Sequence, residues 1–324
     1  MTKQVRVGFV GCGGIANWHF SHFEKNQQAK IVAVCDLIDE RVQKAADRFK
    51  ATPYADYRRM LAKEKLDALY VCVEPCAHDG MELLAVEKGC HLFVQKPVAL
   101  SMAYANRVKA AVKKAGVISS VGYQTRYMDF MPRIKGWLEM QEVAFVNAYY
   151  VGGMPTVWWW RRRDTSGGQV VEQTTHAFDL LRFLFGDVAS VQAMGSRGLM
   201  TAVETYDTED CSAVTLKFKS GLVGSVYSAC CLDHGGKYGI EVYCKKGKLE
   251  FFGNTYKITE KNLTIEGKAL NDNGQDIDDT FIEAVRSGDP TEVLTDYADA
   301  CRTLEVTLAA NTSMDAGGEL VRLR

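Results

Sequence analysis

Short apolar runs alternate with amphipathic stretches over the first 122 residues of the chain. The runs are bounded by turns and apolar along most of their length, which is typical of parallel strands buried on both faces. They cover Val5–Val10, Ile31–Cys35, Ala68–Val73, His91–Val94 and Val117–Val121. The stretches between them have helical periodicity and cover Ile15–Lys25, Asp39–Phe49, Tyr57–Lys63, Cys76–Lys88 and Ser101–Ala115. This alternation predicts an α/β domain over residues 1–122, with a doubly wound parallel sheet.

The pattern changes after Gly122. Longer strands with alternating polar and apolar positions follow, at Val143–Val151, Cys211–Lys219, Leu222–Leu232, Ile240–Cys244 and Lys248–Phe252. A helical segment is predicted near Val170–Phe185, and two helices and a short strand close the chain, at Asp276–Ser287, Thr295–Thr312 and Leu320–Leu323. We therefore expect a second, α+β domain over residues 123–324 with an open antiparallel sheet, whose final helix is able to pack back on the first domain.

The turn after the first strand carries the pattern of a dinucleotide site. It reads Gly11-x-Gly13-x-x-Ala16, and Asp36 stands at the end of the next strand. Gly11 permits the tight turn, Gly13 lets the backbone approach a pyrophosphate, and Ala16 allows close packing of helix on sheet. The carboxylate of Asp36 favours NAD over NADP, because it accepts hydrogen bonds from ribose hydroxyls and repels a 2′-phosphate. Arg41 is the one nearby residue that weakens this preference, and a turn or N-cap role for Asp36 is the alternative.

Composition and charge narrow the class of protein. The chain has 324 residues, of which 47% are hydrophobic and 24% charged, and a net charge of −1. Neither nucleic acid nor an anionic membrane is expected as a partner, and no apolar stretch approaches the roughly 20 residues of a membrane span. Because the first strand begins near Met1, we expect no secretory signal and a cytoplasmic location.

The ten cysteines lie in predicted strands and helices without the spacing of a disulfide framework, and we expect reduced, mostly buried thiols. The segment Cys72-x-x-x-Cys76-x-His78 has the ligand types of a metal site but no matching second cluster. No metal is therefore expected.

Two groups of residues carry candidate chemistry. Lys96 and Pro97 follow a buried strand, at the end where ligands bind to open α/β sheets. Glu172, His176 and Asp179 are spaced by four and three residues, which would place them on one face of a helix. A carboxylate beside a histidine fixes its tautomer and stabilises its cation, as a proton acceptor requires. A solvated polar face or a helix-capping cluster is the alternative for this group.

The run Trp158–Arg163 consists of three tryptophans followed by three arginines. Three consecutive indoles cannot all be buried on one side of a strand, so at least one is expected to be exposed. Exposed indole and guanidinium groups suit a polyhydroxylated or acidic ligand, and they suit a subunit interface equally well.

These motifs together resemble the Gfo/Idh/MocA family of oxidoreductases. The resemblance extends over essentially the whole chain. Besides the glycine turn and Asp36, it rests on these segments: Glu74-Pro75-x-x-His78, Gly89-x-His91-x-x-x-Gln95-Lys96-Pro97, Gly122-Tyr123-Gln124-x-Arg126-Tyr127 and Gly167-Gly168-x-x-x-Glu172-x-x-x-His176-x-x-Asp179. Members typically oxidise a hydroxyl of a sugar, glycoside or cyclitol with a nicotinamide cofactor, and their second domain often mediates dimers or tetramers.

The resemblance implies roles for individual residues. Lys96, His176 and Glu172 are the expected catalytic residues. NAD is expected to contact Gly11, Cys12, Gly13, Gly14, Ile15, Asp36, Val73, Glu74, Pro75, His78, Gln95, Lys96 and Gln124. The substrate is expected to contact Lys96, Arg126, Trp160, Arg163, Glu172, His176 and Asp179.

Three positions depart from the family pattern. Gln95 replaces a glutamate, which keeps the hydrogen-bonding capacity and removes a charge beside Lys96. Glu172 is one methylene longer than the usual aspartate, and Glu74 stands where a neutral residue is common. The sequence thus favours an NAD-dependent dehydrogenase of secondary alcohols that assembles into a homodimer or homotetramer. A keto-sugar reductase running the reverse reaction and a non-catalytic NAD-binding regulator are the alternatives.

Overall fold

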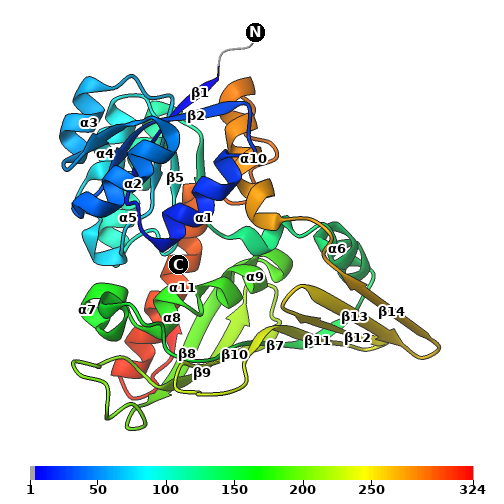
Figure 1. Ribbon diagram of the computed structural model, residues 1–324. Coiled ribbons are helices and arrows are strands. Elements are labelled where there is room, and N and C mark those ends of the chain that lie inside the picture. Colours follow the sequence, from blue (N-terminus) through cyan, green and yellow to red (C-terminus); the bar gives the residue numbers. More distant parts are fainter. Residues whose placement is uncertain (1–3, 324) are drawn as a thin grey trace. The chain divides into compact units, whose positions relative to one another are not determined.

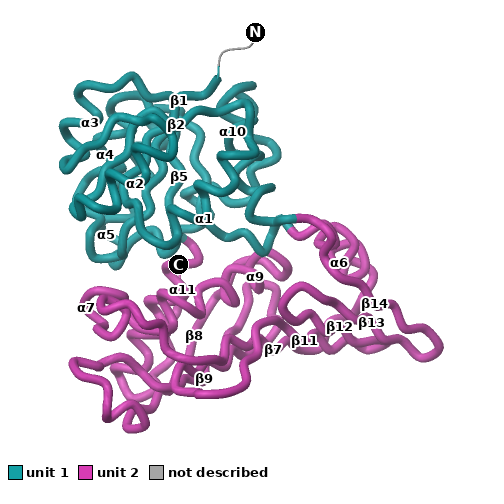
Figure 2. The backbone as a smooth tube through the Cα atoms, viewed as in Figure 1, with its two compact units in different colours: residues 1–127, 272–301 teal, residues 128–271, 302–324 magenta. Residues whose placement is uncertain are grey.

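The computed structural model describes residues 4–323, so positions 1–3 and 324 of the two predicted domain ranges lie outside the described residues. The chain divides into two compact units, coloured separately in Figure 2. The first contains residues 1–127 and 272–301, and the second contains residues 128–271 and 302–324. The thirty residues 272–301, expected in the second domain, thus belong to the first unit.

The first unit is built on a six-stranded parallel sheet with the order β3-β2-β1-β4-β5-β6. Its elements, several of which are labelled in Figure 1, are β1 (Val5–Val10), α1 (Gly14–Phe23), β2 (Ala29–Cys35), α2 (Asp39–Phe49), β3 (Thr52–Tyr54), α3 (Tyr57–Lys63), β4 (Ala68–Val71), α4 (Met81–Glu87), β5 (His91–Val94), α5 (Met102–Ala115), β6 (Ser119–Val121) and α10 (Asn273–Ser287), with 3₁₀ turns η1 (Pro75–Ala77) and η2 (Gln124–Tyr127). The order reverses between β1 and β4, and ligands of open α/β sheets bind at such a reversal. The doubly wound prediction is confirmed, although β3 was missed because it has only three residues.

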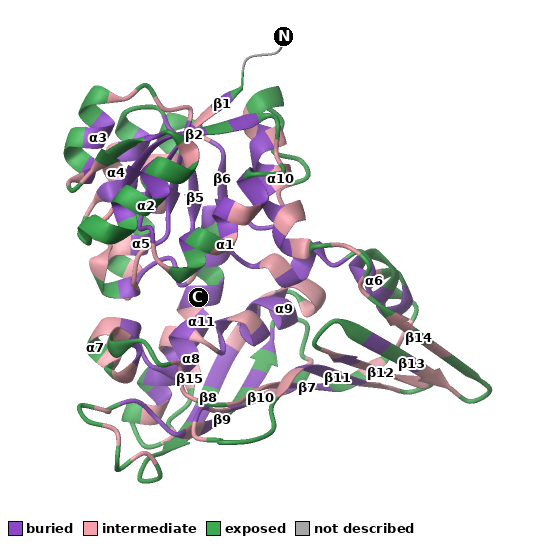
Figure 3. Cartoon of the chain, viewed as in Figure 1, coloured by how far each residue is buried: buried purple, intermediate pink, exposed green. Residues whose placement is uncertain are grey.

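Helices α1, α2 and α10 share one hydrophobic core with the strands of this sheet. Phe281 of α10 lies with its ring centroid 5.6 Å from that of Tyr70 and 5.5 Å from that of Phe93. The strands are mostly buried in Figure 3, whereas exposed residues gather on α2 and α3. α10 joins the first unit because its apolar side chains complete the cover of β4 and β5.

The second unit contains a nine-stranded sheet with the order β14-β13-β12-β11-β7-β10-β9-β8-β15. Its elements are α6 (Met131–Glu139), β7 (Val143–Val151), η3 (Trp158–Arg161), α7 (Arg163–Ser166), α8 (Gln169–Glu172), α9 (Thr175–Phe185), β8 (Val188–Ser196), β9 (Cys211–Phe218), β10 (Val223–Ala229), β11 (Lys237–Cys244), β12 (Gly247–Phe252), β13 (Thr255–Glu260), β14 (Leu263–Lys268) and β15 (Val321–Arg322). The pairs are antiparallel except for β7 with β10, which is parallel. The antiparallel sheet expected from the sequence is therefore confirmed, with one parallel pair of strands within it.

One face of this sheet carries the core of the second unit. Apolar side chains of α6, α9 and α11 (Tyr297–Asp315) pack there against inward-facing strand residues. α11 begins in the first unit, where the Tyr297 hydroxyl donates to the carbonyl of Val98 at 3.2 Å, and ends in the second. Among the helices described, none is long and apolar enough to cross a bilayer. All ten cysteines are free, and six of them are buried: Cys12, Cys35, Cys72, Cys90, Cys230 and Cys301.

We predict that Phe281→Ala lowers the free energy of unfolding by about 3–5 kcal/mol, because it opens a cavity between α10 and the sheet. Arg286→Ala, on the exposed side of the same helix, serves as the matched control and should leave stability unchanged. Urea unfolding of the three proteins measures the effect. Equal stability of the two variants would mean that α10 does not pack on the first sheet.

Candidate active site

The turn between β1 and α1 is shaped to receive a pyrophosphate. Gly11 has a φ of +91°, and a Cβ there would lie 2.2 Å from the carbonyl oxygen of Cys72, so only glycine fits. A Cβ on Gly14 would meet nothing within 4 Å, and Gly13 caps α1 without a side-chain hydrogen bond. The N–H groups of the first helical turn thus have no side-chain cap, the helix dipole favours an anion there, and these residues fit the phosphates of a dinucleotide.

Asp36 lies directly after β2, where its carboxylate is held by two backbone donors. The N–H of Cys12 donates to one oxygen at 2.7 Å and the N–H of Ile38 to the other at 2.9 Å. Both oxygens keep lone pairs for ribose hydroxyls. Leu37 is 88% exposed and brings no positive charge. Arg41 approaches the glycine turn instead, with its Nη1 3.8 Å from the place of a Cβ on Gly13.

A buried carboxylate orients His78, which lies beyond β4. Val73, Glu74 and Pro75 lead into this segment, in which Glu74 caps η1 without a side-chain hydrogen bond. His78 Nδ1 contacts Glu82, and the Tyr104 hydroxyl donates to the same carboxylate at 2.6 Å. Burial alone would raise the pKa of Glu82, but the contacts with His78 and Tyr104 outweigh it and hold that pKa below its ordinary value. With Nδ1 engaged, His78 has only Nε2 left for a ligand.

Lys96 lies two residues after the end of β5, at the carboxyl edge of the parallel sheet. The Lys96–Pro97 peptide bond is cis. Gln95 is buried and contacts His19 of α1, with 2.6 Å between the two Nε2 atoms. Gln124 is half-buried, and its carbonyl accepts from Asn273 at 2.9 Å.

Arg126 is a buried structural cation in the first unit. Its guanidinium pairs with Asp299 at 2.7 Å and donates to the carbonyl of Leu294 at 2.7 Å. Arg126 was expected to contact the substrate, and its side chain is only 4% exposed. Its observed contacts hold the segment before α11 against η2.

In the second unit, the expected single helical face for Glu172, His176 and Asp179 is wrong. α8 ends at Glu172 and α9 begins at Thr175. The N–H of Thr174 bonds to the carbonyl of Gln169, which closes α8, and a new series of hydrogen bonds starts from the carbonyl of Thr174. Glu172 therefore lies on a different helix from the other two residues.

Glu172 is held by a tryptophan. The Nε1–H of Trp160 donates to Glu172 Oε2 at 2.7 Å, and both side chains are buried. Trp160 thus orients a carboxylate, in place of the direct substrate contact expected from the sequence. Trp158 is 63% exposed, which confirms that the three indoles are not all buried.

Tyr150 is a site residue that sequence reasoning missed. Its ring stacks on His176, with 6.5 Å between centroids and 17° between planes. Burial, and then the charge of Glu172, raise the pKa of Tyr150. The alternation along β7 was the available signal, because it places Tyr150 on the same face as the buried Val146 and Ala148.

Asp179 and Arg163 also have protein partners. Asp179 is buried and accepts from the hydroxyl of Thr303 at 3.1 Å, which ties α9 to α11. Arg163 makes a bidentate pair with Asp315 at 2.7 and 2.8 Å. Both were expected to contact substrate, and both connect elements of the second unit.

Two family models match the chain. The model described as "Oxidoreductase family, NAD-binding Rossmann fold" matches residues 5–123, and the GFO/IDH/MocA C-terminal domain matches residues 139–250. Together they cover more than half of the sequence.

Characterised relatives align over most of their length. The chain is 25% identical to a myo-inositol 2-dehydrogenase from Thermotoga maritima, over 89% of this chain and 90% of the relative. It is 27% identical to a scyllo-inositol 2-dehydrogenase (NAD(+)) from Bacillus subtilis, over 98% and 96%. Among solved structures, levoglucosan dehydrogenase in complex with NADH and L-sorbose superposes with a TM-score of 0.89 at 16% identity, over 99% of each chain. At this low sequence identity, the similarity to levoglucosan dehydrogenase shows the fold alone.

We predict that Tyr104→Phe destabilises the protein by about 1.5–3 kcal/mol at neutral pH, because the buried charge of Glu82 loses a donor. The variant raises the pKa of Glu82 toward its unfolded value, so it removes stability that is present above that value. The difference from wild type should therefore shrink as the pH falls below about 4. Denaturant unfolding between neutral and acidic pH measures it.

Tyr54→Phe is the matched control, since the Tyr54 hydroxyl donates at 2.9 Å to the more exposed Glu64. Its loss should be smaller, because partly solvated ion contacts contribute little. Identical losses in the two variants at every pH would contradict a buried, ionised Glu82.

Proposed function

Because the chain belongs to the Gfo/Idh/MocA family of NAD-binding oxidoreductases, we propose that it is a dehydrogenase that oxidises a secondary hydroxyl of a sugar, glycoside or cyclitol. The names of the inositol dehydrogenase relatives support this class of substrate. The observation that carries the proposal is the position of Lys96. It follows β5 at the carboxyl edge of the parallel sheet, the edge that also carries the Gly11 turn.

The chain's own residues fit NAD. The first helical turn of α1 would hold the pyrophosphate, and Asp36 would hold the adenosine ribose. The segments after β4 and β5, and Gln124, would line the nicotinamide. When bound, NAD supplies a hydride acceptor for the carbinol carbon.

The remaining chemistry belongs to side chains. Oxidation removes a hydride from the carbinol carbon and a proton from its oxygen. We assign the proton to the imidazole of His176, with its ring stacked on Tyr150. The ammonium group of Lys96 stabilises negative charge that develops on the oxygen before the carbonyl forms. Glu172, oriented by Trp160, supplies the carboxylate that stabilises the histidine cation.

Four residues of the expected substrate set have protein partners. Arg126, Arg163 and Asp179 are paired and Trp160 donates to Glu172, so we assign these four to holding the scaffold. Lys96, Glu172 and His176 remain as candidate substrate contacts.

The proposal predicts that Lys96→Met and His176→Ala bind NAD normally but lose turnover. Loss of a general base costs about 10²–10⁴-fold and loss of a positioned electrostatic stabiliser about 10²–10³-fold. The rate of oxidation should rise with pH as His176 becomes able to accept a proton. This rise with pH should be absent in His176→Ala. Steady-state rates and calorimetry of NAD binding provide the two measurements.

Lys88→Met and His234→Ala are the matched controls, because both residues are exposed and outside the candidate site. Near-normal rates of Lys96→Met and His176→Ala on a true substrate would overturn the catalytic assignment. Tight NAD binding without turnover of any alcohol would instead favour the non-catalytic regulator.

The geometry of Asp36 also predicts cofactor preference. NAD should bind more tightly than NADP, and Asp36→Ser with Leu37→Arg should shift the preference toward NADP, since repulsion is removed and a phosphate partner added. Calorimetry with both cofactors tests this. Leu37→Arg alone, which keeps the carboxylate, should shift it less. Equal affinities in the unmutated protein would contradict the assignment.

We also propose a homodimer or homotetramer that is assembled through the outer face of the second sheet. Aromatic side chains gather there: Phe145 stacks on Tyr243 with centroids 4.6 Å apart, and Tyr149 stacks on Tyr227 at 5.9 Å. Phe145 and Tyr227 remain 43% and 45% exposed. Apolar groups in such a row favour burial against another protein surface.

Light scattering should give a mass above that of one chain, and Phe145→Asp should lower it. Leu199→Asp, at a loop residue that is 72% exposed, is the control and should keep the wild-type mass. A monodisperse wild-type monomer at micromolar concentration would contradict the proposed assembly.

A further inference from the structure

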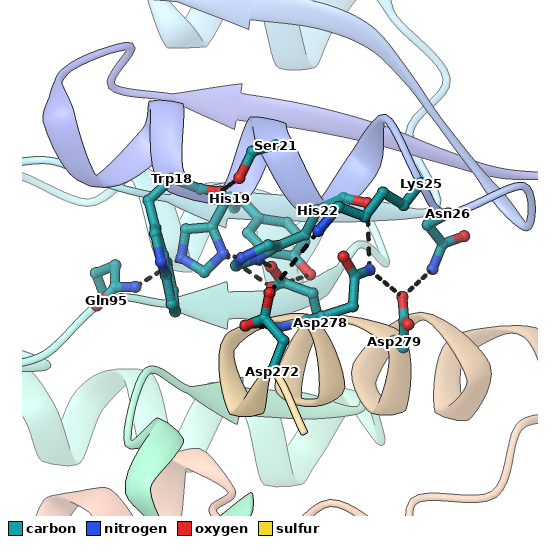
Figure 4. A network of polar contacts seen from close by, with 12 residues as sticks. Trp18, His19, Ser21, His22, Lys25, Asn26, Gln95, Asp272, Asp278 and Asp279 are labelled. Carbon is teal, nitrogen blue, oxygen red and sulfur yellow. Dashed lines mark hydrogen bonds and ion pairs between the residues drawn. The ribbon is translucent and has the colours of Figure 1, made fainter. Parts of the chain in front are cut away.

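A buried carboxylate in the first unit collects three hydrogen bonds from two elements. Asp278 of α10 lies 2.7 Å from Nδ1 of His19 and 2.6 Å from Nδ1 of His22, both on α1. The hydroxyl of Tyr70 on β4 donates to it at 3.1 Å. Figure 4 shows the two imidazoles of α1 converging on this side chain, with Gln95 on the other side of His19. No step of the proposed reaction uses these groups.

The hydrogen-bond partners determine where the protons lie. Asp278 meets two ring nitrogens and a hydroxyl, and a carboxylate is the form of the group that accepts from all three. A carboxylate only accepts hydrogen bonds, and each Nδ1 must therefore carry the proton. In a neutral imidazole with its proton on Nδ1, Nε2 is a bare acceptor.

His19, His22 and Asp278 are also a ligand set that suits a metal ion. The distances favour hydrogen bonds. Ligand atoms around a tetrahedral zinc ion lie roughly 3.3 Å apart, given metal–ligand bonds of about 2.0 Å, whereas these pairs lie 2.6–2.7 Å apart. Within the described part of the chain, no residue of this cluster has a buried side-chain nitrogen or oxygen atom that lacks a hydrogen-bond partner.

Gln95 connects this cluster to the lysine segment. Its Nε2 lies 2.6 Å from Nε2 of His19, and its Oε1 accepts from the backbone N–H of Lys96 at 3.3 Å. Gly122 makes room for the amide, because a Cβ there would lie 2.4 Å from Oε1 and 2.9 Å from the amide nitrogen. Only an amide with its nitrogen toward His19 satisfies a bare Nε2, and this orientation turns the oxygen toward Lys96.

We propose that His19 is a positioning residue for Lys96: Asp278 fixes its Nδ1–H tautomer, its bare Nε2 accepts from the Gln95 amide, and the amide oxygen holds the backbone N–H of Lys96. The link to turnover rests on the proposed function. The tautomer and the contact with Gln95 do not.

The hydrogen bonds that connect Asp278, His19 and Gln95 explain why a glutamine at position 95 is compatible with a neutral His19. A glutamate at position 95 could not donate a hydrogen bond to His19. Nε2 of His19 would then have to carry a proton and donate it to the glutamate. His19 would then be an imidazolium between two carboxylates. Gln95→Glu should therefore change the protonation of His19, whereas Gln95→Met should leave its Nε2 without a donor.

Nitrogen NMR of histidine-labelled protein tests the network without any assay of activity. His19 is identified by the signal lost in His19→Asn, and Gln95→Glu is compared with wild type at neutral pH. We expect a neutral ring with the proton on Nδ1 in the wild-type protein and a doubly protonated ring in Gln95→Glu. A wild-type His19 protonated on Nε2, or coordinated through Nδ1 to stoichiometric zinc, would overturn the proposal.

Kinetics with matched variants test the positioning role. Asparagine can keep a donor at the place of Nδ1 but offers no Nε2, so His19→Asn removes the acceptor for Gln95, and His22→Asn is the control in the same cluster. We expect kcat to fall about tenfold for His19→Asn with KM for NAD nearly unchanged, and to stay within about twofold for His22→Asn. Gln95→Met should cause the same fall, and the double variant with His19→Asn should lose no more.

Equal losses in His19→Asn and His22→Asn, or additive losses in the double variant, would overturn the positioning role. Should His19→Asn fail to fold, the kinetics of Gln95→Met still decide the positioning role. Variants of the other five histidines then identify the His19 signal by elimination, so the NMR comparison also stands. A wild-type protein that turns over no alcohol would overturn the proposed function, while the NMR result would stand on its own.

Discussion

The carboxylate of Asp278 is the interaction on which much of the first unit depends. It comes from a segment that is separated from the rest of the unit by more than a hundred residues of chain, and it enters an apolar core between α1 and the sheet. An unpaired charge there would cost several kcal/mol. Three donors from α1 and β4 offset that cost, so the polar contacts fix the position of α10 while Phe281 supplies the apolar contact.

Two other buried acids, Glu82 and Glu172, are held in the same way. Glu82 is held by His78 and Tyr104, and Glu172 is held by Trp160. In each case the carboxylate lies behind or beside a group that the resemblance places at the cofactor or the substrate. Buried charges with complete sets of partners restrict side-chain rotation, and such restriction keeps reacting groups in place. In both units these contacts hold candidate site residues in place.

Local patterns predicted several elements with their observed bounds and missed others, such as β8 and α6. β1, β5 and β7 and helices α2 and α3 have the predicted bounds, because burial on one or both faces leaves a clear period in the sequence. The Gly11 turn and the position of Asp36 followed from local geometry. The break between α8 and α9 could not be predicted in this way. It depends on a hydrogen bond from the N–H of Thr174 to the carbonyl of Gln169, and the hydrophobic pattern gives no sign of that bond.

Long-range partners were beyond the sequence. The residues that meet Arg126, Asp179 and His19 are Asp299, Thr303 and Asp278, each more than a hundred positions away. The resemblance identified Arg126 and Asp179 as substrate contacts because it carried positions without their partners. It gave no role to His19 or Tyr150. Only the fold brings such residues together, and this is why the site was predicted less completely than the sheet.

The most direct test of the account is a transfer experiment with the purified protein and NAD. A panel of cyclitols, sugars, sugar acids and glycosides is screened for reduced nicotinamide, and the best substrate is then prepared with deuterium on its carbinol carbons. The account predicts that deuterium from one carbinol carbon appears in the reduced cofactor by mass spectrometry, with a carbonyl formed at that carbon. Reduction of NAD without deuterium transfer, or NAD binding with no reduction by any member of the panel, would contradict it.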